Sequence, residues 1–330
     1  MTTRFDVLGI GNAIVDVIST VEDEFLTDNG LVKGSMQLID ENRAQDIYDI
    51  MGPGIEVSGG SAANTVAGLA SFGNKAAFFG KVKADQLGNV FRHDISAAGV
   101  SFDTPGAKDG PDTAQCLILV TPDGERTMNT FLGACVEFGP DEVEESIVRD
   151  SKVTYMEGYL WDPEQAKQAF LKAAEIARGA GRDVSLSLSD AFCVDRHRDS
   201  FLELIRRDVD ILFANEDEIK SLYQVSSFDE ALQAVRQDCK LAALTRSRAG
   251  SVIISGDEVH VVEARKVDKV VDTTGAGDLY AAGFFAGYTN GKDLARCGHL
   301  GALAASEVIS HIGARPQESL KDLASKNGLL

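Results

Sequence analysis

The chain has 330 residues, enough to bury a large core in one α/β domain with an appendage or in two ordinary domains. Its formal net charge of −19 argues against a nucleic-acid polymer or an anionic membrane as the main partner. Five scattered cysteines, with no Cys-x-x-Cys pair, indicate reduced thiols rather than disulfides or a zinc site. No signal-peptide pattern and no long apolar run is present, so we expect a cytoplasmic protein without a membrane span.

Short apolar runs alternate with amphipathic stretches along most of the chain, which is typical of a mostly parallel sheet with helices on both faces. Core strands are predicted at 6–11, 76–81, 152–157, 183–188, 209–213 and 241–245. Helices are predicted at 62–71, 87–97, 163–178 and 200–206. The expected fold class is doubly wound α/β, with residues 1–330 in a single domain.

Two segments, 15–39 and 102–131, interrupt this alternation with polar residues and turn signals. Antiparallel strands fit these segments better than crossover units do. Because both segments are inserted near the start of the core, they can meet as one small sheet. We predict that this sheet forms a lid over a ligand site.

The first predicted strand runs into the sequence GIGNAI at 9–14, which approaches a dinucleotide-binding fingerprint. Ile14 stands where the third glycine is needed, and a strand rather than a helix follows, so the pattern disfavours a dinucleotide. Asn12 and Asp16 remain as polar groups near the carboxyl end of a strand, where open α/β sheets bind ligands. Asp16 either accepts hydrogen bonds from substrate hydroxyls, or it caps a turn or faces solvent.

The sequence GGSAAN at 59–64 enters a predicted helix. Gly59 and Gly60 permit a ligand to approach the backbone closely. Ser61 can cap the helix, and Asn64 projects from its first turn toward the same mouth. A simple cap needs only Ser61, so the doubled glycine and Asn64 favour a binding loop.

Two later strand ends also carry polar groups. The sequence ANEDE at 214–218 offers acids that either hold a water-solvated magnesium ion or complement a helix dipole. The sequence TRSRAG at 245–250 offers hydroxyls, cations and a glycine to phosphates. The chain has no P-loop sequence and no protein-kinase His-Arg-Asp or Asp-Phe-Gly set.

The most informative stretch is DTTGAGD at 272–278, which lies at a predicted loop-to-helix junction. Unpaired backbone N–H groups and the helix dipole favour an anion there, and the glycines let a phosphate approach. Asp278 either complements the dipole or takes a proton from an attacking hydroxyl. Together these features favour phosphoryl transfer.

These motifs resemble those of the ribokinase-like, or PfkB, family of small-molecule kinases. Residues 272–278 resemble the C-terminal signature of that family, residues 59–64 resemble the N-terminal one, and Asn215 with Glu218 matches its Asn-x-x-Glu pattern. The resemblance implies ATP-dependent phosphorylation with Asp278 as the base and the amides of Gly275, Ala276 and Gly277 stabilising the transferred group.

Within the family, GNAIVDV at 11–17, MQLI at 36–39 and LGA at 132–134 resemble the branch that phosphorylates nucleosides, and adenosine is the expected acceptor, at its 5′-hydroxyl. Phe192 is expected to stack on the base. The other acceptor-binding residues that the resemblance implies are Asn12, Asp16, Gln37, Leu38, Gly59, Gly60, Ser61, Asn64, Arg126, Leu132 and Ala134.

For ATP, the resemblance implies binding by Asn215, Thr245, Gly250, Thr274, Gly275 and Gly277, with Mg²⁺ held through water by Glu218. Asp272 and Thr274 are expected beside a monovalent cation such as K⁺. The alternatives are a sugar kinase or an inosine or guanosine kinase of the same family, and a non-catalytic nucleotide-binding protein. Both a monomer and a homodimer fit the sequence.

Overall fold

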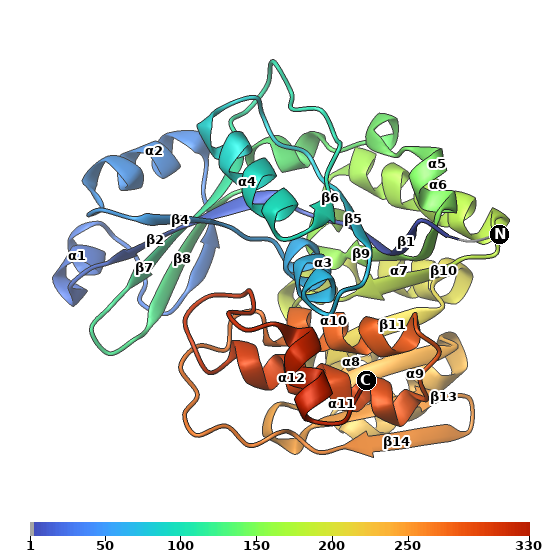
Figure 1. Cartoon of the computed structure of the whole chain (residues 1–330). Helices are drawn as coiled ribbons and strands as arrows, with labels where there is room; N and C mark the ends of the chain where they lie inside the picture. Colours follow the sequence, from blue (N-terminus) through green and yellow to red (C-terminus); the bar gives the residue numbers. More distant parts are fainter. Residues whose placement is uncertain (1–2) are drawn as a thin grey trace.

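The structure is a computed structural model that describes residues 3–330, within which the strands form two sheets (Figure 1). In the larger sheet the strand order is β14-β13-β12-β11-β10-β9-β1-β5-β6, and all neighbours are parallel except β12–β13 and β13–β14. Its strands are β1 (Phe5–Ile10), β5 (Ala76–Phe79), β6 (Val100–Ser101), β9 (Ser151–Glu157), β10 (Asp183–Ser187), β11 (Ile211–Asn215), β12 (Leu241–Thr245), β13 (Ser251–Ser255) and β14 (Glu258–Val262). The six predicted core strands are all present, and the α/β fold class is confirmed.

Helices cover both faces of the large sheet, because side chains alternate along each strand and both sets are apolar. Val7 belongs to one hydrophobic cluster and its neighbour Leu8 to the other. The first cluster is completed by α3 (Ser61–Ser71), α4 (Gln86–Ala97), α10 (Ala276–Tyr288), α11 (Leu294–Val308) and α12 (Leu320–Lys326). The second is completed by α5 (Glu145–Arg149), α6 (Glu164–Gly179), α7 (Ala191–Asp208), α8 (Glu216–Tyr223) and α9 (Phe228–Asp238). No helix within residues 3–330 is both long and apolar enough to cross a bilayer.

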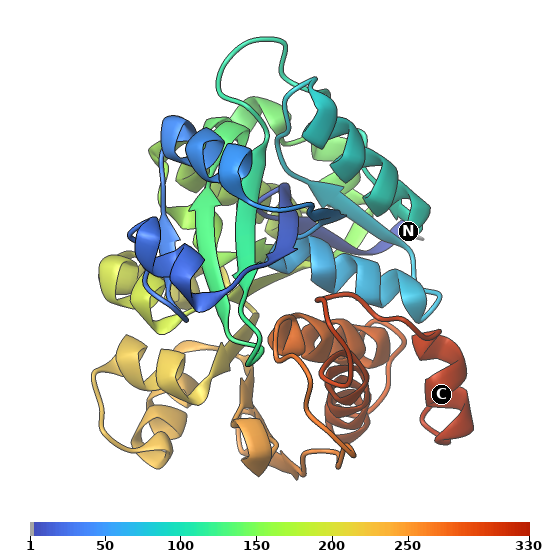
Figure 2. The same ribbon diagram turned by 90° about the vertical axis from the view of Figure 1, so that its left-hand side faces the viewer.

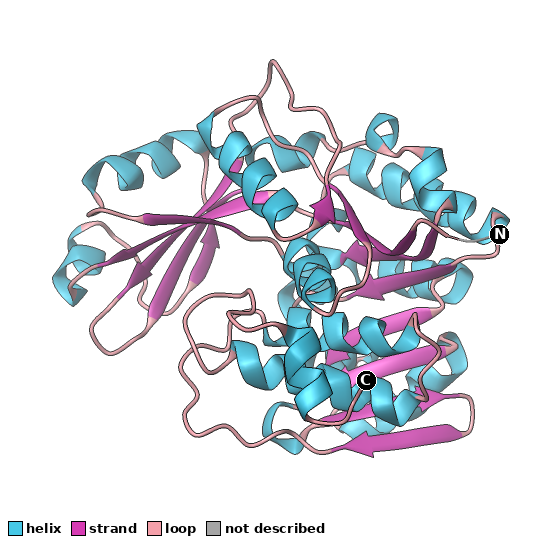
Figure 3. Ribbon diagram, in the orientation of Figure 1, coloured by secondary structure: helices cyan, strands magenta, loops and turns pink. Residues whose placement is uncertain are grey.

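The small sheet stands apart from the large one, on the left in Figure 3, and faces the viewer in Figure 2. It has the order β3-β8-β7-β2-β4, with β2 (Ile14–Thr20), β3 (Met36–Leu38), β4 (Ile55–Ser58), β7 (Ala114–Val120) and β8 (Arg126–Phe131). The expected antiparallel pairing holds for β7–β8 and β2–β4 but is wrong for β2–β7 and β3–β8, which are parallel. The sheet is mixed because β2 and β7, like β3 and β8, lie far apart in the chain and are not joined by a tight hairpin.

The two faces of the small sheet differ. Val15 and Val17 of β2 are buried in one cluster with Leu26 of α1 (Asp23–Asp28) and Ile47 of α2 (Glu41–Ile50). Asp16 lies between the two valines, so its side chain points to the opposite face. On that face Val57, which pairs with Asp16, is exposed, whereas Cys116 and Ile118 are buried.

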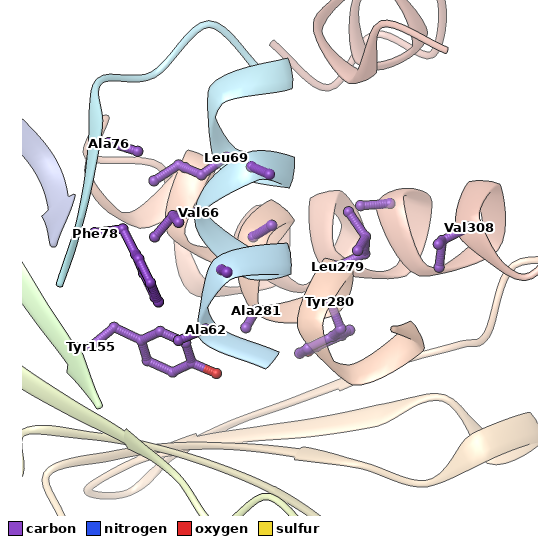
Figure 4. Close-up of a cluster of buried hydrophobic side chains, with 14 of the residues drawn as sticks. Ala62, Val66, Leu69, Ala76, Phe78, Tyr155, Leu279, Tyr280, Ala281 and Val308 are labelled. Atoms are coloured by element: carbon purple, nitrogen blue, oxygen red, sulfur yellow. The ribbon is translucent and has the colours of Figure 1, made fainter. Parts of the chain in front are cut away.

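Small residues allow α3 to pack closely on α10. A Cβ atom added to Gly68 would lie 2.5 Å from Cδ1 of Leu279 and 2.9 Å from Cβ of Ala282. Figure 4 shows Ala62, Val66 and Leu69 of α3 beside Leu279 and Ala281 of α10. The close approach brings the first turns of the two helices together.

Replacement of Gly68 by alanine should therefore destabilise the fold by about 1–3 kcal/mol, because the added methyl group overlaps α10. Helix propensity alone predicts the opposite, since alanine is the better helix former by about 0.8–1 kcal/mol. Urea unfolding measures the effect. Gly179→Ala is the matched control, because a Cβ atom there meets nothing within 4 Å. Equal stability of the two variants would contradict the packing argument.

Candidate active site

Polar side chains from several strands gather at one edge of the large sheet. The parallel strands β1, β9, β10, β11 and β12 all end there. Asn12 follows β1, Glu157 ends β9, Asp190 follows β10, Asn215 ends β11 and Thr245 ends β12. Helices α3 and α10 also begin at this edge, so their positive dipole ends face the same space.

Asp278 in the first turn of α10 is joined to α3. One carboxylate oxygen accepts a hydrogen bond from Oγ of Ser61 at 2.6 Å, and the other accepts from Nδ2 of Asn64 at 3.1 Å. Burial raises the pKa of Asp278 to about 6, while these two hydrogen bonds act in the opposite direction. A carboxylate with this pKa is ionised at neutral pH and can still accept a proton during a reaction.

Asp16 lies beside the glycine pair that opens α3. A Cβ atom on Gly59 would meet Oδ2 of Asp16 at 2.6 Å, and one on Gly60 would meet the carbonyl oxygen of Asn12 at 2.2 Å. Gly60 also has a φ of 94°, which glycine adopts without strain. Burial raises the pKa of Asp16 to about 7, opposed by the charges of Arg126 and Arg315. The structure thus brings together Asn12, Asp16, Gly59, Gly60, Ser61, Asn64 and Asp278.

Glu157 is a site residue that the sequence analysis did not identify. It is 1% exposed and accepts hydrogen bonds from N of Asn12 at 3.3 Å, from Nδ2 of Asn12 at 2.8 Å and from N of Ala62 at 2.8 Å. Burial raises its pKa to about 7 against the effect of these bonds. Glu157 therefore fixes the end of β1 to the first turn of α3. The only indication in the sequence was that Glu157 lies at the end of a predicted strand, where ligands bind in α/β sheets.

The small sheet carries some of the predicted acceptor residues toward the site and others away from it. Asp16 pairs with Cys116, Cys116 with Thr130, and Thr130 with Leu38, so Leu38 shares the face of Asp16. Gln37 lies on the opposite face, where its Nε2 donates to Oδ1 of Asn129 at 2.7 Å. The sequence could not assign this face, because one residue of register reverses it.

The remaining predicted acceptor residues are placed as follows. Ala134 is fully buried, whereas Leu132 keeps some exposure, and Sγ of the adjacent Cys135 donates to the carbonyl of Ala13 at 3.4 Å. This contact places the segment next to the β1–β2 junction. Phe192 near the start of α7 is 65% exposed, and the guanidinium of Arg196 lies 4.8 Å from its ring centroid. Stacking of Phe192 on a base stays a prediction.

Arg126 connects the small sheet to the loop before α10. Its Nη1 donates to Oδ2 of Asp272 at 2.6 Å and to Oγ1 of Thr274 at 2.7 Å. Burial tends to raise the pKa of Asp272, but hydrogen bonds from Gly313 and Thr274 and the charge of Arg126 hold it below its usual value. Arg126 thus occupies one oxygen of Asp272 and the hydroxyl of Thr274, and the monovalent cation beside these residues stays a prediction.

The first turn of α10 provides amides for an anion. Gly275 has a φ of 78° and precedes the helix, and its carbonyl accepts the bond from N of Leu279. The amide of Ala276 donates to the carbonyl of Thr273 at 3.2 Å, so it is engaged within the loop. The amides of Gly277 and Asp278 precede N of Leu279, the first intrahelical donor, and are available to a phosphate.

The predicted ATP-side residues lie on adjacent strands. Asn215 pairs with Thr245 across β11 and β12, and Thr245 pairs with Ser251 directly after Gly250. Asn215 caps α8, and its backbone N and its Nδ2 donate to the two oxygens of Glu218 at 2.8 and 2.5 Å. Asn215, Thr245 and Gly250 are thus contiguous at this edge, while Thr274, Gly275 and Gly277 lie at the start of α10.

Glu218 and Asp190 fit a water-solvated magnesium ion. Burial raises the pKa of Glu218 to about 7. The hydrogen bond from Asn215 lowers this pKa, and the negative charge of Asp190 raises it. A divalent cation would reduce the electrostatic repulsion between these two carboxylates. Within residues 3–330 no group of three His, Cys, Asp or Glu side chains can hold a metal.

Comparisons with known proteins agree with this geometry. A family model described as pfkB family carbohydrate kinase matches residues 54–320. A solved structure of a probable sugar kinase protein from Rhizobium etli is 56% identical with a TM-score of 0.94, and 100% of each chain is covered. That of adenosine kinase from Sinorhizobium meliloti is 55% identical with a TM-score of 0.92, covering 98% of this chain and 99% of the other. Adenosine kinase 2 of Arabidopsis thaliana is 25% identical over 93% of this chain and 94% of that protein. These similarities confirm the ribokinase-like fold and the predicted family resemblance.

The raised pKa of Asp16 predicts a pH-dependent gain in stability on substitution by asparagine. In the fold this carboxyl is neutral at pH 5 and ionised at pH 8, whereas in the unfolded chain it is ionised at both. The contribution of the neutral Asp16 carboxyl to the free energy of unfolding is therefore lost as the pH rises through about 7. The gain of Asp16→Asn over wild type should be larger at pH 8 than at pH 5 by about 1–3 kcal/mol.

Urea unfolding at the two pH values measures this gain. Asp46→Asn is the control, because Asp46 is exposed on α2 and should give the same result at both. A pH-independent gain at Asp16 would show that its burial does not disfavour the charge.

Proposed function

Since the chain belongs to the pfkB family of carbohydrate kinases, we propose that it transfers the γ-phosphoryl group of ATP to the 5′-hydroxyl of adenosine, giving ADP and AMP. The chain is a phosphotransferase with an alcohol acceptor. The observation that carries the proposal is the contact of Asp278 with Ser61 and Asn64. It sets the base of the C-terminal motif directly against the loop expected to hold the acceptor.

In the proposed reaction the acceptor oxygen attacks the γ-phosphorus, the bond from that phosphorus to the β,γ-bridging oxygen breaks, and the hydroxyl proton passes to Asp278. A positioned base of this kind contributes roughly 10²–10⁴-fold. Ser61 and Asn64 hold both carboxylate oxygens, so the carboxylate cannot rotate away from the attacking hydroxyl. Holding the two substrates in line contributes as much or more.

The first turn of α10 and Arg126 would stabilise the negative charge on the transferred phosphoryl group. The free amides of Gly277 and Asp278 lie beside the base, and one such donor is worth about 3–4 kcal/mol in the transition state. Arg126 reaches this loop from the small sheet, which supports its role as part of a lid. Magnesium, when bound near Asp190 and Glu218, would neutralise charge on the β- and γ-phosphates.

The open face of the small sheet supports a nucleoside as the acceptor. Leu38 and Ile55 lie on the face of Asp16 and are 53% and 68% exposed. Apolar side chains left exposed beside a polar site suit a flat base, which would cover them. Asp16 can accept hydrogen bonds from the ribose hydroxyls. The 55% identity to a protein named adenosine kinase supports the same acceptor.

A sugar is the second candidate acceptor. The protein from Rhizobium etli that is 56% identical is described as a probable sugar kinase. Asp16, Asn12 and Asn64 would bind the hydroxyls of a free sugar as well as those of a ribose. In this case the apolar face of the small sheet would remain without a ligand.

A panel of acceptors distinguishes these functions. With magnesium ATP, adenosine should give the fastest ADP release, and inosine, guanosine, ribose and fructose should react more slowly. Faster reaction of ribose or fructose would replace the nucleoside by a sugar. Absence of ADP release with the whole panel would contradict the kinase proposal.

Substitution of Asp278 by asparagine should leave the fold intact but lower kcat by roughly 10²-fold or more, because the amide cannot take the proton. Steady-state kinetics with adenosine measure kcat, and thermal unfolding checks that the variant is folded. Turnover close to that of the wild type would mean that another group is the base.

A further inference from the structure

A partly buried arginine, Arg315, lies near the proposed base on a loop far along the chain. The loop 309–319 joins α11 to α12 and packs on the loop before α10. N of Gly313 donates to Oδ2 of Asp272 at 2.9 Å, and a Cβ atom on Gly275 would meet Cα of Ala314 at 2.8 Å. The next residue, Arg315, is thereby carried to the inner side of the site.

Arg315 contacts the base through one intermediate residue. Its Nε donates to Oδ1 of Asn64 at 3.3 Å, and Nδ2 of the same Asn64 donates to Asp278 at 3.1 Å. Arginine has only donors, so this contact fixes the carboxamide of Asn64 with its oxygen toward Arg315. Asn64 can then present only N–H groups to Asp278. A donor favours the ionised carboxylate over the protonated acid, which is the form a base requires.

The surroundings of Arg315 do not suggest a purely structural role. Its Nη2 is buried and has no hydrogen-bond partner among residues 3–330. Burial lowers the pKa of Arg315 to about 10, and Asp94 and Asp16 act in the opposite direction. A guanidinium nitrogen that is buried without a partner costs folding free energy. An arginine retained solely to stabilise the loop would make more hydrogen bonds.

We propose that Arg315 is a positioning residue for the phosphoryl transfer, which holds the carboxamide of Asn64 so that only its N–H groups face Asp278. This inference rests on the proposed function, since it concerns the same base. The other titratable groups near Asp278 are Asp16 of β2, Tyr155 and Glu157 of β9, and Tyr159. Burial raises the pKa of both tyrosines and keeps them neutral, while the charges of Arg126 and Arg315 favour the ionised form of Asp16.

The test uses Arg315→Gln and Arg315→Lys in the full chain, with kcat and KM for ATP and the best acceptor measured across pH. Arg315→Gln loses the fixed donor and the charge, so kcat should fall roughly tenfold and the acid limb of kcat should move to higher pH. Arg315→Lys keeps a charge and a donor, and should restore most of the activity and the wild-type acid limb. Arg265→Gln is the control, because Arg265 is an exposed arginine that donates to Asn327.

A double-mutant cycle with Asn64→Ala decides whether Arg315 acts through Asn64. In that background Arg315→Gln should have little further effect, because the carboxamide is already absent. Full additivity of the two substitutions overturns the inference. A fall in kcat without a shift of the acid limb also overturns it, as does failure of both Arg315 variants to fold, since either result makes Arg315 structural.

Different results would contradict the role of Arg315 and the kinase activity. An active wild type with an equally active Arg315→Gln variant and an unmoved pH profile overturns only the role of Arg315. A folded wild type that releases ADP with no acceptor overturns the kinase proposal and the role of Arg315 with it.

Discussion

The site depends on the close packing of α3 against α10. Ser61 and Asp278 are separated by more than two hundred residues in the chain, yet Oγ of Ser61 lies 2.6 Å from the carboxylate of Asp278. Gly68 favours that contact because it leaves room for Leu279 along the helix interface. In the proposed function, the first turn of α3 presents the acceptor loop and the first turn of α10 presents the anion-binding amides. A displacement of either helix would separate the two halves of the site, and positions in catalysis tolerate little displacement.

Several carboxyl groups lie at the same edge of the sheet, where burial disfavours their charged forms. Burial raises the pKa of Asp16, Glu157 and Glu218 to about 7. Such groups make the ligand-free fold less stable at neutral pH than its packing alone would give. Cations offset this cost, as Arg126 and Arg315 do for Asp16. Substrates that arrive with hydroxyl donors or with a metal ion would offset it further, so the site is arranged for ligands rather than for stability.

The sequence predicted the site best where function is encoded by local motifs. Gly59, Asn64 and Asp278 were identified because glycines, caps and acids recur at a loop-to-helix junction, and the structure brings them together. Strand positions were predicted because buried parallel strands are continuous apolar runs. Glu157 lay in a predicted strand but gave no sign of its three partners. Arg315 could not have been found, because nothing in its local sequence indicates a contact with Asn64.

Glu157 also bears on the order in which the chain can complete its site during synthesis. Its carboxylate joins Asn12 and Ala62, which leave the ribosome long before it does, while strand β1 lies between β5 and β9 in the sheet. An N-terminal fragment that lacks β9 therefore has no carboxylate to accept the hydrogen bond from the amide of Ala62 in α3. Contacts this distant in sequence form late. The loop 59–64 would thus be fixed only after Glu157 is made, and the proposed base, Asp278, would join it only when most of the polypeptide is complete.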